Sequence, residues 1–281
     1  MEELRGMPVV KHIAEDVTHR MEALAKKGVV PTLAVIRVGE REDDLSYERG
    51  LLKRFDAVQA KVVSIVLEAD VSEEKLIETL KKCNEDDSIN GILLFRPLPK
   101  HLDEKKIVEM VDPIKDVDCM CLTNIAHTFT QSGLGHEPCT PQAVIEMMDF
   151  YDIDLTGKKV VVVGRSMVVG KPMAMMLLKK NATVTVCHTK TKDLKAECKE
   201  ADILVACAGV AEMIDETYVK EGAVVFDVGI NVVDGKLCGD VKYKSVTGTA
   251  DKATPVPGGV GTVTTSVLLK HTVWAAEQMN S

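Results

Sequence analysis

The chain has 281 residues, of which 46% are hydrophobic and 28% are charged, and its net charge is −8. This balance is typical of a globular protein with one large or two ordinary domains, and it argues against a nucleic-acid partner, which would favour a basic surface. The chain has no apolar run of bilayer-spanning length, and its first residues, MEELRGMPVV, lack an apolar signal core. We therefore expect a cytoplasmic protein without a membrane partner.

In residues 8–27, apolar side chains recur at three- and four-residue spacing, which predicts an amphipathic helix ended by Gly28. Strands and helices then alternate, with strands expected at 29–39, 60–68 and 90–95 and helices expected at 44–58 and from Ser72 onward. This alternation is typical of βαβ units that form a parallel sheet.

The second half of the chain repeats the alternation with near-continuous apolar runs, as strands covered on both faces require. These runs lie at 159–164, 182–188, 201–209 and 222–229, and VDGKLCGDV then predicts a short hairpin. We predict an α/β protein of two lobes, the second a Rossmann-type doubly wound sheet. We expect the first lobe to span residues 1–145, completed by a last helix at 262–281, and the second to span 146–261.

Cysteine and histidine patterns give no metal site. The one close cysteine pair, Cys119 and Cys121, has a spacing that fits no common zinc site, and we expect all eight cysteines to be reduced and buried. The histidines His136 and His271 are isolated in sequence, and we interpret them as surface or packing residues.

The stretch VVVVGRSMVVGKP carries a buried strand into Gly164 and starts a helix near Gly170. A doubly wound sheet binds a dinucleotide at such a turn, because free amides and the helix dipole attract phosphate. The G-x5-G spacing differs from G-x-G-x-x-G, so a purely structural turn stays an alternative. The next strand ends in VCHTKT, without the acid usual in NAD-specific proteins, and Arg165 could pair with a 2′-phosphate. We therefore favour NADP, with NAD as the alternative.

Two further loops contain functional candidates. The stretch TPVPGGVGT, residues 254–262, forms either a rigid loop of close backbone approach or a domain hinge. In RPLPKHLDEKKIVEMVDPIKDVD, Asp116 and Asp118 lie in a loop, where a carboxylate can accept paired hydrogen bonds from an amino-heterocycle. A cap or turn role is the alternative for either aspartate.

Taken together, these motifs resemble the bifunctional methylenetetrahydrofolate dehydrogenase/cyclohydrolases. Matching stretches span almost the whole chain and include GRSMVVGKP, VFDVGIN, KDVD and TPVPGGVGT. The resemblance implies an N-terminal lobe that binds tetrahydrofolate and a C-terminal lobe that binds NAD(P), in a cytosolic homodimer. The implied reaction is hydride transfer from 5,10-methylenetetrahydrofolate, followed in bifunctional members by hydrolysis of the methenyl cation to 10-formyltetrahydrofolate.

The same resemblance assigns roles to individual positions. Tyr47 matches a tyrosine that stacks against folate and Asp118 an aspartate that holds the pterin, and both are the catalytic candidates. The expected cofactor contacts are Gly164, Arg165, Ser166, Thr189 and Ile230. The expected folate contacts also include Pro97, Leu98, Pro257, Gly258, Gly259, Val260 and Gly261.

Five positions depart from the family pattern. Cys119 replaces a glycine and Thr262 replaces a proline, and the other three positions bear on the chemistry. The lysine four residues after the tyrosine is Leu51, the serine three residues before it is Asp44, and the glutamine before PLP is Phe95. Hydride transfer mainly needs two aligned rings, whereas hydrolysis needs a positioned group with a tuned pKa. We therefore predict a dehydrogenase whose cyclohydrolase step is lost or weak. The alternatives are a bifunctional enzyme with relocated groups, such as Lys53 or Arg49, and a non-catalytic folate- or nucleotide-binding relative.

Overall fold

The structure is a computed structural model that describes residues 1–281. The chain divides into two compact units, each built from two separate stretches. Unit 1 contains residues 1–11 and 140–264, and unit 2 contains residues 12–139 and 265–281.

Unit 1 is built on a six-stranded sheet in which every neighbouring pair is parallel, in the order β1-β11-β8-β7-β5-β6. Its strands are β1 (Glu2–Glu3), β5 (Lys159–Val163), β6 (Thr183–Cys187), β7 (Ile203–Ala206), β8 (Val224–Asp227) and β11 (Lys252–Ala253). The central strands are buried nearly throughout, as their apolar runs predict, because helices cover a parallel sheet on both faces. The predicted Rossmann-type lobe is confirmed.

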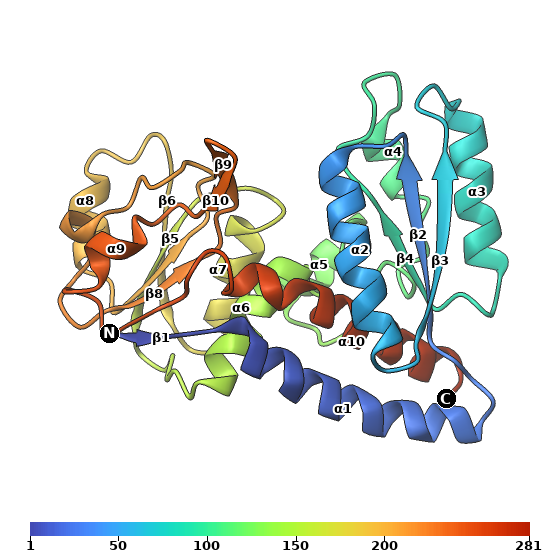
Figure 1. Ribbon diagram of the computed structural model, residues 1–281, viewed down its shortest axis with the longest axis horizontal. Coiled ribbons are helices and arrows are strands. Elements are labelled where there is room, and N and C mark those ends of the chain that lie inside the picture. The colour runs from blue at the N-terminus through green and yellow to red at the C-terminus, as the bar shows by residue number, and fades with distance from the viewer. The chain divides into compact units, whose positions relative to one another are not determined.

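The hairpin and helical segments complete unit 1 (Figure 1). The predicted hairpin is present as β9 (Asn231–Val233) paired antiparallel with β10 (Lys236–Cys238). The helical segments are α6 (Cys139–Phe150), α7 (Gly170–Lys179), α8 (Leu194–Lys199), η1 (Glu216–Tyr218), α9 (Tyr243–Val246) and η2 (Val260–Thr262).

Unit 2 contains a three-stranded parallel sheet in the order β3-β2-β4. Its strands are β2 (Thr32–Val38), β3 (Lys61–Leu67) and β4 (Gly91–Leu94), and its helices include α2 (Glu42–Asp56), α3 (Glu73–Glu85), α4 (Glu104–Val108) and α5 (Leu122–Thr130). The strand β2 is completely buried, and its Ile36 packs in one core cluster with Leu76, Leu80 and Ile92. The helix predicted from Ser72 onward is present as α3, and Ser72 caps it, since its side chain accepts a bond from the Lys75 amide.

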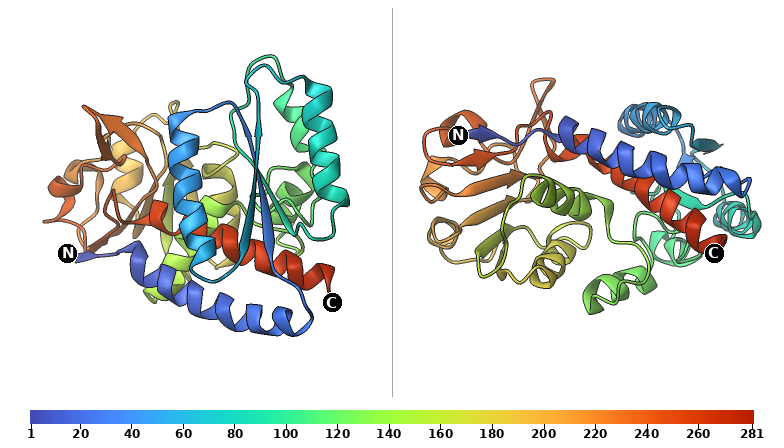
Figure 2. Two further views of the ribbon diagram at one scale, coloured as in Figure 1. Left: turned by 45° about the vertical axis from the view of Figure 1, so that its right-hand side comes forward. Right: turned by 90° about the horizontal axis from the view of Figure 1, so that it is seen from below.

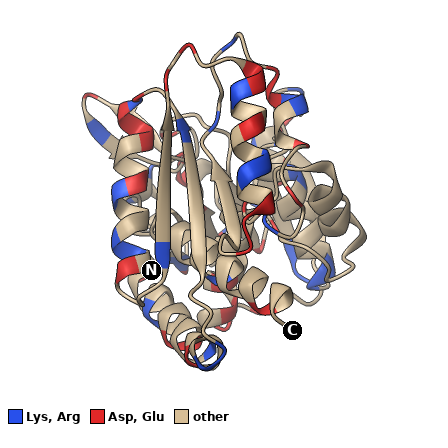
Figure 3. Ribbon diagram, turned by 90° about the vertical axis from the view of Figure 1, so that its right-hand side faces the viewer, with Lys and Arg blue, Asp and Glu red and all other residues tan.

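Two long helices, α1 (Gly6–Lys26) and α10 (Thr264–Met279), begin in unit 1. Their remaining residues, 12–26 and 265–279, belong to unit 2 and run side by side there (Figures 1 and 2). The guanidinium of Arg20 on α1 pairs with Glu277 on α10 at 2.6 Å, and Lys27 donates to the Asn280 carbonyl at 2.7 Å. Figure 3 shows that the charged residues gather on helices and connecting loops, whereas the strands are mostly uncharged. None of the helices is both long and apolar enough to cross a membrane.

Candidate active site

Helix α2 lies on the surface of unit 2 and buries one of its faces against the rest of that unit. Its first turn is acidic and its last turn is basic, which suits the helix dipole. The buried residues Asp44, Glu48, Leu51 and Phe55 recur at three- and four-residue spacing, so they share one face. Leu51 and Phe55 are completely buried.

Tyr47 is half-buried beside this face, and its ring meets the ring of Phe95. The ring centroids lie 5.8 Å apart with the planes at 88°, an edge-to-face contact. Thus two positions that the sequence singled out, one on α2 and one directly after β4, do come together. Lys53 and Arg49, the proposed relocated cations, are both exposed.

The two buried carboxylates of α2 differ in how fully they are paired. Glu48 accepts from Arg37 Nε at 3.2 Å and from Ser64 Oγ at 2.5 Å, so both of its oxygens have partners. Asp44 has a looser ion pair with Arg41, at 3.7 Å, and burial raises the pKa of its carboxyl above the ordinary value. Asp44 is therefore the carboxylate on this face with capacity for a further partner.

The segment after β4 lies at the carboxyl end of the sheet, where parallel α/β sheets bind ligands. Phe95 and Arg96 are half-buried, Leu98 is buried and Pro97 is exposed. The Arg41 guanidinium donates to the Pro97 carbonyl at 3.1 Å, which ties the start of α2 to this segment.

The loop after α4 contains two aspartates with different roles. Asp116 is completely buried, and it accepts from the Met120 amide at 2.8 Å, the Cys121 amide at 2.9 Å and Asn124 Nδ2 at 3.0 Å. These bonds use its oxygens to hold the loop together, so Asp116 takes the structural role that the sequence left open.

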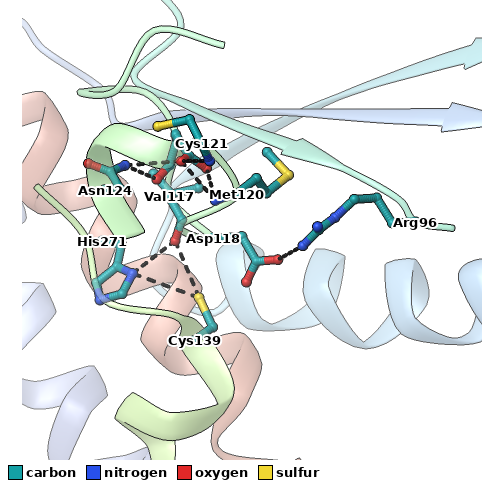
Figure 4. Close-up of polar contacts among 9 residues, drawn as sticks. Arg96, Val117, Asp118, Met120, Cys121, Asn124, Cys139 and His271 are labelled. Atoms are coloured by element: carbon teal, nitrogen blue, oxygen red, sulfur yellow. Dashed lines mark hydrogen bonds and ion pairs between the residues drawn. The ribbon is translucent and has the colours of Figure 1, made fainter. Parts of the chain in front are cut away.

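Asp118 is half-buried, and its Oδ2 lies 3.8 Å from Arg96 Nη2 (Figure 4). Burial raises the pKa of Asp118 to about 6, while Arg96 opposes this rise. Since Arg96 follows Phe95 directly, Tyr47, Phe95 and Asp118 gather around one end of β4.

Two histidines that the sequence analysis interpreted as surface or packing residues support this loop through hydrogen bonds that the sequence did not predict; His136 is buried and His271 is half-buried. His136 bonds to the Ile114 carbonyl at 3.0 Å, and His271 bonds to the Val117 carbonyl at 2.9 Å. Their ring centroids are 5.0 Å apart, and burial lowers the pKa of His136 to about 3 and that of His271 to about 4. Both rings are therefore neutral at pH 7. The two residues are 135 positions apart, so no local sequence signal joins them.

In unit 1, the predicted phosphate-binding turn joins β5 to α7. Gly164 has φ +142°, and a Cβ there would lie 2.4 Å from the Cys207 carbonyl oxygen. A Cβ on Gly170 would lie 2.2 Å from the Gly164 oxygen. Both glycines are therefore required by close backbone approach. Ser166 Oγ accepts from the Val169 amide at 3.1 Å, and Arg165 is exposed at the mouth of the turn.

The turn after β6 is organised by its own side chains. Thr191 Oγ1 accepts from the His188 amide at 2.9 Å, and the His188 Nδ1 accepts from the Lys190 amide at 3.1 Å. Thr189 and Lys190 are exposed. The turn thus presents a hydroxyl and an ammonium, and no carboxylate, to a ligand.

A cavity of about 220 Å³ in unit 1 brings Ile230 together with the glycine-rich loop. Its lining includes Pro257, Gly258, Gly259 and Gly261. Val260, which we grouped with these residues, is instead buried with 2% of its surface exposed. The cavity wall is thus formed by the motifs DVGIN and PVPGG.

Buried carboxylates explain why DVG and GDV recur on either side of the hairpin. Asp240 accepts from the amides of Ala208, Gly209 and Val210 at 2.6–3.0 Å. Asp227 accepts from the amides of residues 229, 240 and 241, and a Cβ on Gly239 would lie 1.8 Å from its Oδ2. The pair fixes the hairpin base and the end of β7 beside the cavity. The sequence motif indicated importance here, but not this carboxylate pair.

Comparisons with known proteins identify the family to which both parts of the chain belong. The model of the tetrahydrofolate dehydrogenase/cyclohydrolase catalytic domain matches residues 4–118, and that of the NAD(P)-binding domain of the same family matches residues 138–280. The chain belongs to the tetrahydrofolate dehydrogenase/cyclohydrolase family. Its resemblance to that family, drawn from the motifs, is confirmed, although the comparisons do not address the replacements at Asp44, Leu51 and Phe95.

Individual family members resemble the chain along its full length. The "Bifunctional protein FolD" of Clostridioides difficile (strain 630) is 50% identical over 279 residues, covering 99% of this chain and 97% of that protein. The bifunctional enzyme FolD of Campylobacter jejuni, described as a methylenetetrahydrofolate dehydrogenase/cyclohydrolase, has a TM-score of 0.96 at 38% identity and covers 99% of each chain. A Trypanosoma brucei dehydrogenase-cyclohydrolase, solved with NADP and an inhibitor, has a TM-score of 0.92 at 34% identity, covering 98% of this chain and 96% of that one.

Proposed function

We propose that this protein oxidises 5,10-methylenetetrahydrofolate to 5,10-methenyltetrahydrofolate and transfers the hydride to NAD(P). The match of both domain models of one folate dehydrogenase family carries the proposal. The site geometry agrees with it, because Tyr47 and Asp118 gather at the end of β4, where a folate ring would bind.

The residues of unit 2 would bind and align the substrate. An ionised Asp118 accepts two N–H bonds from the amino-heterocycle, and the half-buried Tyr47 ring packs against the folate's aromatic portion. Loss of the hydride is driven by the lone pairs of the folate nitrogens, so the step requires alignment and no general base. A nicotinamide bound in unit 1 would accept the hydride.

In unit 1, the residues that would hold the dinucleotide fit a phosphate group. The exposed guanidinium of Arg165 suits a phosphate, whereas the amides of Val169, Gly170 and Lys171 already bond to Ser166. The exposed hydroxyl of Thr189 and ammonium of Lys190 suit the 2′-phosphate of NADP better than a carboxylate would. We therefore propose NADP over NAD, in line with the NADP bound by the Trypanosoma brucei relative. The ratio of kcat/KM for the two cofactors tests this choice.

For the second chemical step there are two candidate functions. The comparisons favour the bifunctional enzyme that we gave as the alternative, since relatives at about half identity are named bifunctional, and none of them supports loss of the cyclohydrolase. One site observation favours loss: Leu51 fills its position with a completely buried apolar side chain, and Phe95 covers Tyr47. Neither residue can move a proton.

One assay separates these functions. Formation of reduced cofactor and of the methenyl product is followed independently, with NAD and with NADP. The dehydrogenase proposal is wrong if neither cofactor is reduced, and a non-catalytic binding protein is then favoured. Enzyme-dependent conversion of added methenyltetrahydrofolate to 10-formyltetrahydrofolate, well above the spontaneous rate, establishes the bifunctional enzyme. If the methenyl product accumulates and is lost only at the rate of spontaneous hydrolysis, the protein is the single-step enzyme.

The family resemblance also implies a homodimer, and we propose that state for this chain. Sedimentation velocity over a range of concentrations tests it, and a monomer mass at micromolar concentration would contradict it.

A further inference from the structure

Arg96 is a half-buried cation to which the sequence motifs assign no role. It directly follows Phe95 at the end of β4, and its Nη2 lies 3.8 Å from Asp118 Oδ2 (Figure 4). This distance is too long for a hydrogen bond. The guanidinium therefore supplies positive charge to the carboxylate without occupying the lone pairs that a ligand would use.

The surroundings of Asp118 otherwise oppose its ionised form. Burial raises the pKa of this carboxyl, and the neighbouring carboxylate of Asp116 raises it further. Arg96 and then Cys139 lower it, while the Cys119 thiol nearby is neutral because burial raises its pKa above the ordinary range. Among these groups, Arg96 carries the compensating charge.

We propose that Arg96 is a positioning residue that keeps Asp118 ionised and turned toward the amino-heterocycle, and so sets the affinity for the folate substrate. The proposal rests on the proposed function, because it assigns Asp118 to the pterin. A carboxylate can accept from both N–H groups of an amino-heterocycle, whereas a protonated carboxyl gives up one acceptor and places a donor against a donor. Folate affinity should therefore follow the ionised fraction of Asp118.

The size of the effect follows from the charge and the exposure of the pair. An opposite charge within about 4–6 Å lowers a carboxyl pKa by about 1–3 units, and the lower end applies here because both side chains retain about a quarter of their exposure. With a pKa of about 6 in the native protein, removal of Arg96 would give about 7. The ionised fraction then falls about fivefold at pH 6, about twofold at pH 7 and hardly at all at pH 8.5.

The test compares Arg96→Leu and Arg96→Gln with Arg96→Lys, which keeps the charge, and with Lys100→Leu, which removes an exposed charge nearby. The folate KM is measured from pH 5.5 to 8.5 with saturating cofactor, and the Asp118 pKa is measured by carboxyl NMR titration. We expect the two charge-removing variants to raise the folate KM about fivefold at pH 6 and to converge on the native value at pH 8.5. The cofactor KM should not change, and Arg96→Lys should restore most of the native profile.

The outcomes distinguish a charge effect from a structural one. A folate KM that rises equally at every pH, or an Asp118 pKa that does not change in either charge-removing variant, would overturn the role of Arg96. An unchanged folate KM at pH 6 would overturn it as well. If the native protein reduces neither NAD nor NADP, the proposed function fails, and the NMR titration still shows whether Arg96 controls Asp118.

Discussion

We expect the double substitution Leu51→Lys with Phe95→Gln to give this chain a faster cyclohydrolase step. Lysine at position 51 would place an amine on the buried face of α2, one turn from Glu48 and two turns from Asp44. Glutamine at position 95 would supply an amide to orient it. Because a positioned acid–base group typically contributes about 10²–10⁴-fold, hydrolysis should accelerate at least about a hundredfold if these two positions are what it lacks.

The structure sets the stability cost of this change. Leu51 is completely buried, so its replacement forfeits about 2 kcal/mol of apolar burial, reduced by the lysine stem's own contacts. Loss of the Tyr47–Phe95 contact adds about 1 kcal/mol. These two losses sum to about 3 kcal/mol, and taking the lysine amine out of water adds about 1–3 kcal/mol more. Because the usual unfolding free energy is about 5–15 kcal/mol, the Tm of the variant is measured first to establish that it folds.

The assay follows the decay of added methenyltetrahydrofolate without cofactor, after subtraction of the spontaneous rate. Leu51→Met with Phe95→Gln is the matched control, because it keeps the volume at position 51 and adds no amine. A folded double variant that hydrolyses no faster than this control would refute the reasoning that the two positions limit hydrolysis. Rapid hydrolysis by the native protein would also refute this reasoning, because it would show that Leu51 and Phe95 do not prevent the step.

Three further results are expected. Arg165→Gln should raise the KM for NADP about tenfold and leave that for NAD unchanged, since a guanidinium–phosphate contact is worth about 1.5 kcal/mol or more; equal effects on both would contradict a 2′-phosphate role. Gly239→Ala should lower the free energy of unfolding, measured in urea, by about 1–3 kcal/mol, because the added Cβ meets the buried Asp227 carboxylate. Gly248→Ala, which has open space around it, should not lower it. Burial lowers the pKa of His136 to about 3, so the unfolded chain binds its proton first and stability falls as pH drops below about 6.5. Glutamine does not titrate, so the urea midpoint of His136→Gln should fall less between pH 6.5 and 4.5 than that of the native protein. An identical fall in the two proteins would contradict a neutral, buried His136 ring.

The fold could be predicted because its signals are local. The strand run at 159–164 is almost entirely apolar, and the glycines at 164 and 170 indicate a turn between strand and helix. The structure explains these glycines, because a Cβ at either position would collide with the backbone. These features depend on periodicity and on conformational freedom, which the sequence shows directly.

The electrostatics of the site could not be predicted in the same way. The family resemblance selects Asp118 rather than Asp116, but the local residues do not show which carboxylate the loop amides occupy. The folded loop shows that it is Asp116. The Arg96–Asp118 pair joins positions 22 residues apart, and His136 and His271 meet across half the chain. Such contacts arise from tertiary packing, which leaves no periodic trace in the sequence.

The charges around β4 and α2 differ from those that the family resemblance implies, and the difference bears on both candidate functions. The site has a leucine where a lysine was expected and a buried carboxylate, Asp44, where a serine was expected, while its cation, Arg96, faces Asp118. The methenyl product is a cation, so a carboxylate in partly buried surroundings stabilises it and a fixed ammonium opposes it. This arrangement therefore favours hydride removal in either case. If the enzyme is bifunctional, the group that activates water must lie elsewhere than position 51, and Asp44, with its raised pKa and loose ion pair, is the acid–base candidate on the same face of α2.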